Sequence, residues 1–331
     1  FQFALPILIF GHVGLISQDN LEVGVPHDYI ISKIYNGKFE YLDYFLGGTH
    51  KWYFFENIFH PINLLHLLFD IKSFFFIKYS LNTIIAYITF YLLCKKLNFS
   101  KFQSSLGAVF YLTLVSTDTP VHFDLAFMPY LLYLILKNKK LTTKNYLIIF
   151  FFGLGGGLAH NVLATLFIPL LARCFFKEVN NKLSIKILLT YYVGLFISDI
   201  HLFNVFLSEE AYHRSEMLGS SPGYIISLKR SLLIPFFDFS IGGYYFFMRI
   251  FMITSIVSGI LYVIITKNKI GLLLLLFVTF IVLIRSIFGT EFHDIFFIGP
   301  LAALKGLNFM RVDKIIPITI SLIVMISLKN D

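Results

Sequence analysis

The stretch GLLLLLFVTFIVLIRSIF, residues 271–288, decides the fold of this chain. Its one charged residue is Arg285, which stands near its end. A helix rises about 1.5 Å per residue, so roughly 20 apolar residues are needed to cross the hydrocarbon core of a bilayer. The stretch is therefore predicted to be a membrane-spanning helix.

The composition of the whole chain agrees with a membrane protein. Of the 331 residues, 57% are hydrophobic and 14% are charged, whereas about a quarter of the residues of a soluble domain are charged. The 40 Phe and 19 Tyr suit a lipid-facing surface with aromatic belts at its interfaces. The net charge of +8 comes from lysines scattered through short connections. This pattern favours contact with anionic lipids and argues against a nucleic-acid partner.

Further apolar segments predict an all-α, polytopic bundle of about 10 transmembrane helices, in a single domain over residues 1–331. The predicted spans are residues 1–16, 79–93, 104–116, 123–136, 146–154, 161–176, 185–200, 245–265, 271–288 and 315–328. Segments 104–116 and 123–136 are expected to form an antiparallel pair inside the bundle. An interfacial helix is predicted over residues 62–78, because polar residues interrupt its apolar ones at His66, Asp70, Lys72 and Lys78.

The lysine distribution orients the chain. Four connections, at 94–101, 137–144, 177–186 and 266–269, hold twelve Lys and one acidic residue, and the positive-inside rule makes them cytoplasmic. The external loops are then approximately 17–78, 201–244 and 289–314. All of the 19 acidic residues except Glu178 and Asp331 fall on this external side. Carboxylates are costly at a membrane, so their gathering predicts chemistry or binding there.

The strongest candidates for catalytic or metal-binding carboxylates are Asp19 and Glu22, which directly follow the first apolar segment in the sequence SQDNLE. They stand about one helical turn apart at the predicted external mouth of that span. A partly desolvated carboxylate there suits a general base or a metal ligand. The alternative is a capping or solvated loop start, since Asp-Asn is common where a helix or turn begins.

Two cationic groups in the other external loops are candidates for binding an anion. His213-Arg214-Ser215-Glu216 combines a bidentate phosphate donor, Arg214, with a titratable neighbour, and a salt-bridged loop is its alternative. Asn308-Phe309-Met310-Arg311 precedes the last span. Arg311 suits an anionic lipid head, or it extends towards ordinary headgroups as interfacial arginines do.

Other motifs carry less chemical information. The run Gly155-Gly156-Gly157 resembles a phosphate loop only weakly, because the Lys-Ser/Thr ending is absent, and a turn or close helix contact is favoured. The ten histidines and two cysteines show no zinc-binding spacing and no disulfide framework. No metal site is therefore predicted from these motifs.

The layout of these features resembles the GT-C class of integral-membrane glycosyltransferases, which use polyprenyl-phosphate sugars. It combines an acidic residue after the first span, a long aromatic external loop with an interfacial helix, and about ten helices. The segments that start at Asp19, His213 and Asn308 are similar to motifs of a bacterial branch of that class.

The resemblance implies an inverting transfer of sugar at the external face. Asp19 matches the first-loop carboxylate that deprotonates an acceptor hydroxyl, and Arg214 or Arg311 would hold the donor phosphate. The wider set of residues expected to act in catalysis or in binding donor and substrate is Asp19, Glu22, His213, Arg214, Glu216, Asn308 and Arg311. No cofactor is required, although Glu22 leaves a divalent cation open. The implied partners are a polyprenyl-phosphate sugar, a glycan, lipid or protein acceptor, and membrane lipids.

Two other classes stay open. A lipid or polysaccharide transporter or flippase is the main alternative, and a non-catalytic subunit of a membrane complex is the other. Transporters usually show internal repeats and ionisable residues near the bilayer midplane, whereas here the acidic residues fall at the external edge. The implied location is a multi-pass position in a bacterial cytoplasmic membrane, with the active site facing outside.

Overall fold

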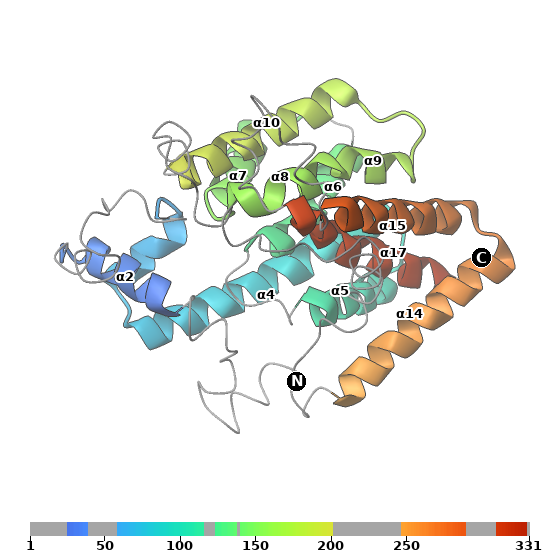
Figure 1. The fold of residues 1–331 in the computed structure, drawn as a ribbon, viewed down its shortest axis with the longest axis horizontal. Helices are drawn as coiled ribbons and strands as arrows, with labels where there is room; N and C mark the ends of the chain where they lie inside the picture. Colours follow the sequence, from blue (N-terminus) through green and yellow to red (C-terminus); the bar gives the residue numbers. More distant parts are fainter. Residues whose placement is uncertain are drawn as a thin grey trace.

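The computed structural model describes residues 25–38, 58–115, 123–137, 140–200, 246–288 and 309–329, in which every regular element is a helix (Figure 1). The all-α prediction is thus confirmed for these residues. In chain order the elements are α2 (Val25–Tyr35), η4 (Pro61–Leu67), α4 (Ile71–Lys96), α5 (Lys101–Val115), α6 (Phe123–Lys137), α7 (Thr143–Gly153), α8 (Leu158–Leu166), α9 (Ile168–Arg173), α10 (Asn181–Ser198), α14 (Phe246–Thr266), α15 (Lys269–Phe288), η7 (Phe309–Ile315) and α17 (Ile316–Ser327).

Two of the described helices are long and apolar enough to cross a membrane. They are α4 and residues Lys269–Ile287 of α15, and only 28% and 33% of their apolar windows are buried inside the protein. Three shorter apolar stretches lie at Leu125–Lys137, Asn161–Arg173 and Phe251–Thr266. Long apolar helices with exposed sides indicate a membrane-associated protein. The number of about ten spans stays a prediction.

The central element of the bundle is α4, which has α5 and α6 packed along it. The Phe90 ring stacks on Tyr111 of α5 at 4.7 Å, and the Thr89 hydroxyl donates to the carbonyl of Ala126 on α6 at 2.6 Å. The expected pairing of 104–116 with 123–136 is only partly realised. The Tyr111 hydroxyl donates to the carbonyl of Leu125, but each helix packs mainly on α4.

The predicted interfacial helix over 62–78 is wrong in its extent. Residues 61–67 form the short 3-10 helix η4, and α4 then runs without a break from Ile71 to Lys96. The Asp70 carboxylate accepts a hydrogen bond from the backbone N–H of Ser73 at 2.7 Å and so caps α4. Residues 71–78 are therefore the first two turns of the long helix.

Glycines and a proline set the geometry of the helices from α7 to α10. Helices α7 and α10 cross closely at Gly153 and Gly194, whose Cα atoms face each other: a Cβ on Gly153 would lie 2.9 Å from the Cα of Gly194. The run 155–157 turns the chain from α7 into α8, as predicted. The predicted helix over 161–176 is divided into α8 and α9 at Phe167, because Pro169 occupies the first turn of α9.

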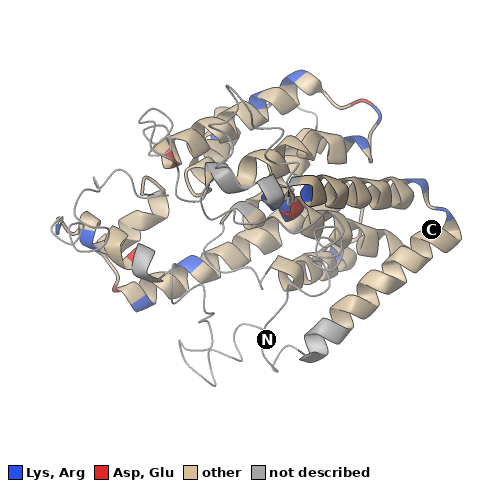
Figure 2. Ribbon diagram, viewed as in Figure 1, with Lys and Arg blue, Asp and Glu red and all other residues tan. Residues whose placement is uncertain are grey.

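One end of the bundle gathers basic connections. There the side-chain amide of Gln103, in the first turn of α5, donates to the carbonyl of Leu328 beyond α17 at 2.7 Å. The Lys96 ammonium at the end of α4 lies 5.8 Å from the ring of Phe176 beyond α9. The α9–α10 and α14–α15 connections lie on this same side, at the right of Figure 2. We call it the basic end, and its cations include Lys95, Lys96, Lys101, Arg173, Lys177 and Lys329, with Lys267 and Lys269 in the α14–α15 connection.

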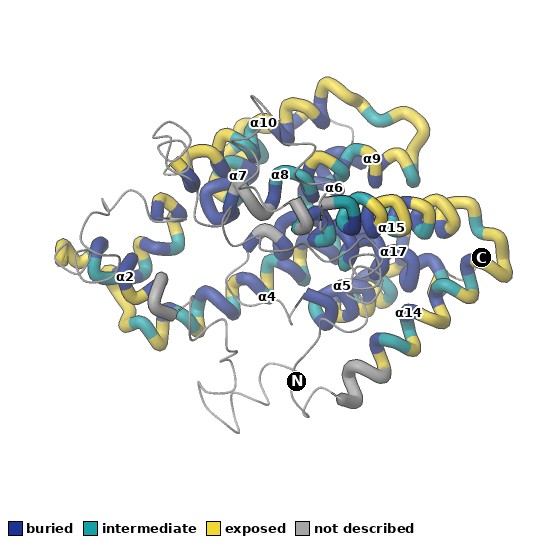
Figure 3. The backbone as a smooth tube through the Cα atoms, viewed as in Figure 1, coloured by how far each residue is buried: buried dark blue, intermediate teal, exposed yellow. Residues whose placement is uncertain are grey.

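Burial varies around the helices. Figure 3 shows buried segments at the centre of the bundle and exposed ones along the outer sides of α10, α14 and α15. The exposed residues on these outer sides are mostly large and apolar, as in Leu189, Leu261 and Leu276. A surface of this kind is unusual for a soluble protein and suits contact with lipid.

Candidate functional site

The end of the bundle opposite the basic end brings distant polar segments together. The His60 ring, just before η4, lies 4.8 Å from the ring of Phe123 at the start of α6. It also packs on Gly155, directly before α8, and α8 packs in turn on η7. We call this the polar end. Five of the six described acidic residues belong to segments at this end, the exception being Glu178; they are Asp28, Asp70, Asp124, Asp199 and Asp313.

A buried ion pair joins α2 to α4 at the polar end. The Lys78 ammonium donates to both carboxylate oxygens of Asp28, at 2.9 and 3.1 Å. The side chains are 10% and 1% exposed respectively. Removing two charges from water costs several kcal/mol per ion unless geometry and further hydrogen bonds compensate. The pair is thus held by the surrounding packing, and it fixes α2 against the start of α4.

A small core supports this pair. Ile30 and Ile34 of α2 pack against Ile58, and the Tyr35 hydroxyl donates to the Ile58 carbonyl at 2.7 Å. The buried ring of His66 stacks on Phe74 of α4 with centroids 3.6 Å apart. The segment α2–η4 therefore packs on the first turns of α4 through both apolar and ionic contacts.

His60 is a neutral imidazole with a defined tautomer. Its Nδ1 accepts a hydrogen bond from the backbone N–H of Ile62 at 3.4 Å and so caps η4. The proton of the neutral ring therefore resides on Nε2. Burial, aided by the positive charge of Lys78, lowers the pKa of His60 to about 4. At neutral pH the ring presents an uncharged N–H donor.

The turn before α8 leaves no room for a side chain at Gly155 or Gly156. A Cβ on Gly155 would lie 2.8 Å from both Cδ2 and Nε2 of His60, and one on Gly156 would lie 2.9 Å from Nδ2 of Asn161. Gly157 is the N-cap of α8 and provides no side-chain cap. Asn161 donates from Nδ2 to the Gly157 carbonyl at 2.9 Å. Its fully buried Oδ1 has no hydrogen-bond partner within the described residues.

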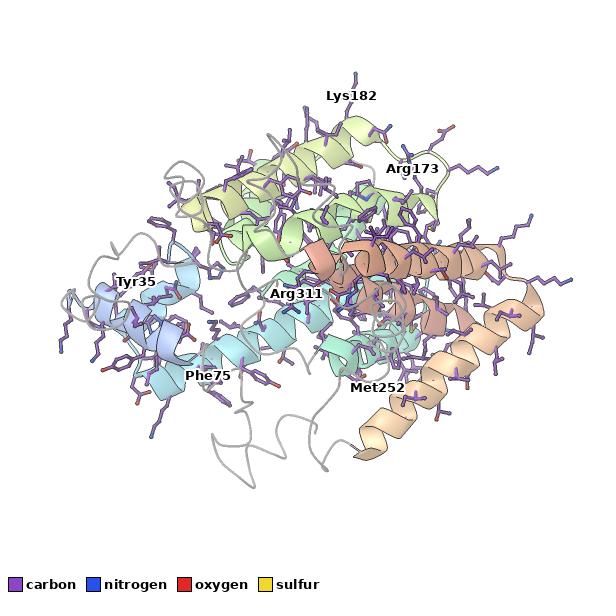
Figure 4. All side chains as sticks on the ribbon, viewed as in Figure 1. Tyr35, Phe75, Arg173, Lys182, Met252 and Arg311 are labelled. Atoms are coloured by element: carbon purple, nitrogen blue, oxygen red, sulfur yellow. The ribbon has the colours of Figure 1, made fainter. Side chains whose placement is uncertain are left out.

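The segment η7 carries a second group of charges. Arg285, near the end of α15, donates from Nε to the Asp313 carboxylate at 2.8 Å, and both side chains are 14% exposed. Lys314 is buried beside them in the chain. Arg311 is half-buried, and it makes no hydrogen bond or ion pair with any residue that the structure describes. Figure 4 shows it near the middle of the molecule.

Most of the residues predicted for the site lie outside the described part of the chain. These are Asp19, Glu22, His213, Arg214, Glu216 and Asn308. Arg311 is the described member of the set, and it belongs to η7 at the polar end. Within the described residues, no group of three or more His, Cys, Asp or Glu side chains is placed to hold a metal ion.

The structure brings together residues that the sequence did not connect. Asp28 and Lys78 are 50 residues apart, and no spacing rule connects them. His60 likewise lies 95 positions before Gly155 in the chain, and only folding brings the two together. The weak signal that did exist was the glycine run, which allows close approach of another group to the backbone.

No protein-family model, curated protein or solved structure matches this chain. Its function is therefore argued from its residues and their arrangement.

Proposed function

We propose that this protein is a multi-pass membrane glycosyltransferase of the GT-C type, which transfers a sugar from a polyprenyl-phosphate donor to an acceptor. The observation that carries the proposal is the uneven distribution of described carboxylates between the two ends of the bundle. Lysine-rich connections with one acidic residue, Glu178, occupy the basic end, while the other described acidic residues stand with Lys78, Arg285 and Arg311 at the polar end. By the positive-inside rule the basic end faces the cytoplasm and the polar end faces outside.

The chemistry needs a base, a phosphate clamp and a lipid-accessible position. Asp19 is the base: its carboxylate takes the proton of an acceptor hydroxyl as the new bond to the anomeric carbon forms on the face opposite the leaving group. The bond between the anomeric carbon and the phosphate oxygen breaks, and polyprenyl phosphate leaves. This displacement inverts the anomeric configuration, and it needs neither a redox cofactor nor a covalent intermediate.

Arg311 stabilises the leaving group in this proposal. Charge develops on the bridging phosphate oxygen as the sugar departs, and a guanidinium placed beforehand stabilises that charge without reorganising. Arg311 suits this role because it has no anionic partner among the described residues and is half-exposed. The adjacent Arg285–Asp313 pair fixes the segment that carries it.

The lipid tail of the donor lies against the apolar sides of the bundle. Helices α14 and α15 expose large aliphatic and aromatic side chains along their length, among them Phe251, Ile264 and Phe280. A polyprenyl chain entering from the bilayer meets such a surface without crossing water. This placement explains why anion-binding groups and exposed apolar helices occur in one domain.

The test is sugar transfer by purified protein in lipid nanodiscs, with a panel of polyprenyl-phosphate sugars. Asp19→Asn is expected to lower kcat by about 100-fold or more, since a positioned base contributes roughly 10²–10⁴. Arg311→Gln is expected to lower kcat/KM by about tenfold or more. The matched control is Arg173→Gln at the basic end, where Arg173 is exposed and donates to Asn181.

The outcomes distinguish between a glycosyltransferase and a transporter. Unchanged transfer by Asp19→Asn removes Asp19 from the mechanism. Equal losses in Arg311→Gln and Arg173→Gln show that the arginine effect is not specific to the polar end. Absence of transfer with every donor, together with movement of labelled lipid across vesicles that contain the protein, favours a transporter instead.

A further inference from the structure

We propose that the basic end of the bundle carries a binding site for one anionic phospholipid. Lysines from the end of α4, the start of α5 and the residues just beyond α17 bind the headgroup phosphate, and the outer face of α5 contacts an acyl chain. The site is independent of sugar transfer, and it lies at the end of the bundle opposite the candidate active site.

The lysines converge on the short loop that joins α4 to α5. The Lys95 ammonium, in the last turn of α4, donates to the carbonyl of Phe99 at 3.1 Å. The Lys329 ammonium, from just beyond α17, lies 5.5 Å from the centre of the Phe99 ring. Lys101 begins α5 two residues after Phe99. Three segments of the chain therefore bring a lysine to the same loop.

A hydrogen bond elsewhere in these segments holds them together. The side-chain amide of Gln103, in the first turn of α5, donates to the carbonyl of Leu328 at 2.7 Å. Leu328 directly precedes Lys329, so this bond keeps that lysine beside the start of α5. The two sides of the site are thus positioned before a ligand arrives, which lowers the entropic cost of binding.

The positive charge at this loop is not balanced by the described residues. Segments 92–104 and 321–329 contain four lysines and no acidic residue, and Asp331 lies outside the described part of the chain. Glu178, the described acidic residue at the basic end, forms no ion pair with any described side chain. Lys95, Lys101 and Lys329 are all exposed. An exposed cluster of this kind is complementary in charge to an anionic headgroup.

The position of the cluster places it at the level of lipid headgroups. Helix α4 is long and apolar enough to cross a membrane, and it ends at Lys96. Basic residues in the last turn of such a helix stand at the boundary between the hydrocarbon core and water. A phosphate of the adjacent lipid leaflet is therefore the anion that these lysines meet.

An apolar stripe on α5 begins directly beside Lys101. Phe102, Leu106 and Val109 are 78%, 40% and 50% exposed. Their spacing of four and then three residues puts them on one face of the helix. A soluble anion contacts the lysines alone, whereas a phospholipid matches both the lysines and this stripe. The combination favours a phospholipid as the occupant.

Binding is measured by native mass spectrometry of the full-length protein in detergent, titrated with phosphatidylglycerol and, separately, with zwitterionic phosphatidylcholine. The dissociation constant of the first bound lipid is the quantity compared. The wild type is expected to bind phosphatidylglycerol about tenfold or more tightly than phosphatidylcholine, because each lysine near an anionic headgroup contributes about fivefold in affinity.

One pair of double variants tests the headgroup. Lys101→Gln with Lys329→Gln removes two charges of the site and breaks no side-chain hydrogen bond with a described residue. It is expected to bind phosphatidylglycerol about 25-fold more weakly. The matched control is Lys144→Gln with Lys182→Gln, which removes two exposed lysines from the first turns of α7 and α10. Figure 4 shows Lys182 directed away from the bundle, and this control should stay within about threefold of the wild type.

A second pair of variants tests the acyl chain. Phe102→Ala removes most of an exposed ring beside the lysines and is expected to weaken phosphatidylglycerol binding about tenfold. Leu189→Ala, at a position 57% exposed on the outer side of α10, is the control and should stay within about threefold. All the substituted side chains are exposed, so the melting temperatures without added lipid should stay within about 2 °C of the wild type.

The site is supported by weaker phosphatidylglycerol binding in both Lys101→Gln with Lys329→Gln and Phe102→Ala, together with wild-type affinity in the two controls. Equal affinity of the wild type for the two lipids overturns it, as does absence of phosphatidylglycerol binding. Equal weakening in the two double variants also overturns it, because the effect is then one of overall charge. Wild-type affinity in Phe102→Ala overturns it as well, since no acyl chain then lies on α5.

Discussion

Lys78 and Asp28 form a bidentate, buried ion pair that links the first described helix to the longest one. The two hydrogen bonds measure 2.9 and 3.1 Å, and neither side chain is more than a tenth exposed. The pair lies beside His60 at the polar end. Because the pair is buried, the stabilities of the two single variants and of the double variant show how much the pair contributes to holding α2 in place.

Removing one member of the pair is expected to destabilise the protein strongly. Asp28→Asn or Lys78→Met removes one charge of the buried pair, and breaking such a pair typically costs about 3–5 kcal/mol. The double variant Asp28→Asn with Lys78→Met should recover part of that loss, because both charges of the pair are removed. Unfolding by denaturant in detergent, followed through the helical signal in circular dichroism, measures the free energies of unfolding. Lys72→Met, on an exposed position of the same helix, is the control and should stay within about 0.5 kcal/mol of the wild type.

The Asp28–Lys78 pair also shows where sequence interpretation reaches its limit. Asp28 alone is a typical surface carboxylate in an external loop, and Lys78 was expected at the end of an interfacial helix. The Asp70 cap begins α4 before Lys78, so that the lysine projects from a continuous helix. A partner 50 residues away is set by tertiary packing, and no local pattern encodes it.

The helices themselves were more predictable, because long apolar runs and lysine-rich connections are local signals. The stretch 271–288 became α15 almost residue for residue, and the glycine run became the predicted turn. The break between α8 and α9 follows from Pro169. The proline is present in the sequence, but the apolar residues around it led to the prediction of one continuous helix over 161–176. In the candidate site, Arg311 is the described residue that both the sequence and the structure indicate.

The crossing of α7 and α10 should not tolerate a side chain at Gly153. A Cβ there would meet the backbone carbonyl of Tyr191 and lie 2.9 Å from the Cα of Gly194. Because these are backbone atoms, the helices must separate, and overpacking of this kind costs about 1–3 kcal/mol. Thermal unfolding of Gly153→Ala measures the loss.

Gly259→Ala is the matched control for that substitution. Its Cβ would approach the Cα of Val324 at 3.2 Å, a milder contact, and alanine gains up to about 1 kcal/mol in helix propensity. Its stability should therefore stay near that of the wild type. A Gly153→Ala variant as stable as Gly259→Ala would show that the α7–α10 crossing adjusts without cost.

Substitutions of Arg285 and Arg311 should differ in their effect on the stability of the protein. Arg285→Gln breaks the 2.8 Å contact with Asp313 and leaves a largely buried carboxylate, so a loss of about 1–3 kcal/mol is expected. Arg311→Gln breaks no hydrogen bond or ion pair with a described residue and should leave the melting temperature nearly unchanged. Differential scanning fluorimetry of both variants makes the comparison. A large loss of stability in Arg311→Gln would assign that arginine a structural role in place of an anion-binding one.

The stability of the protein should fall between pH 6.5 and pH 4 because of His60. Burial, with Lys78 as the second cause, lowers the pKa of His60 in the folded state from 6.5 to about 4. The unfolded chain therefore binds a proton that the folded protein does not, and stability decreases as the pH falls through this window. The full effect is about 3 kcal/mol near pH 4, at 1.36 kcal/mol per pKa unit. More than about one pH unit above 6.5, His60 is almost unprotonated in both states, and the effect vanishes.

The pH effect is isolated by comparison with His60→Asn, because other groups titrate in the same range. Asn keeps the η4 cap but does not titrate, so the difference in unfolding free energy between wild type and variant should favour the wild type at pH 7 and shift towards the variant by about 3 kcal/mol at pH 4. Chemical unfolding at four or five pH values gives this difference directly. A difference that is constant with pH would show that His60 takes up its proton as readily in the folded protein as in the unfolded chain.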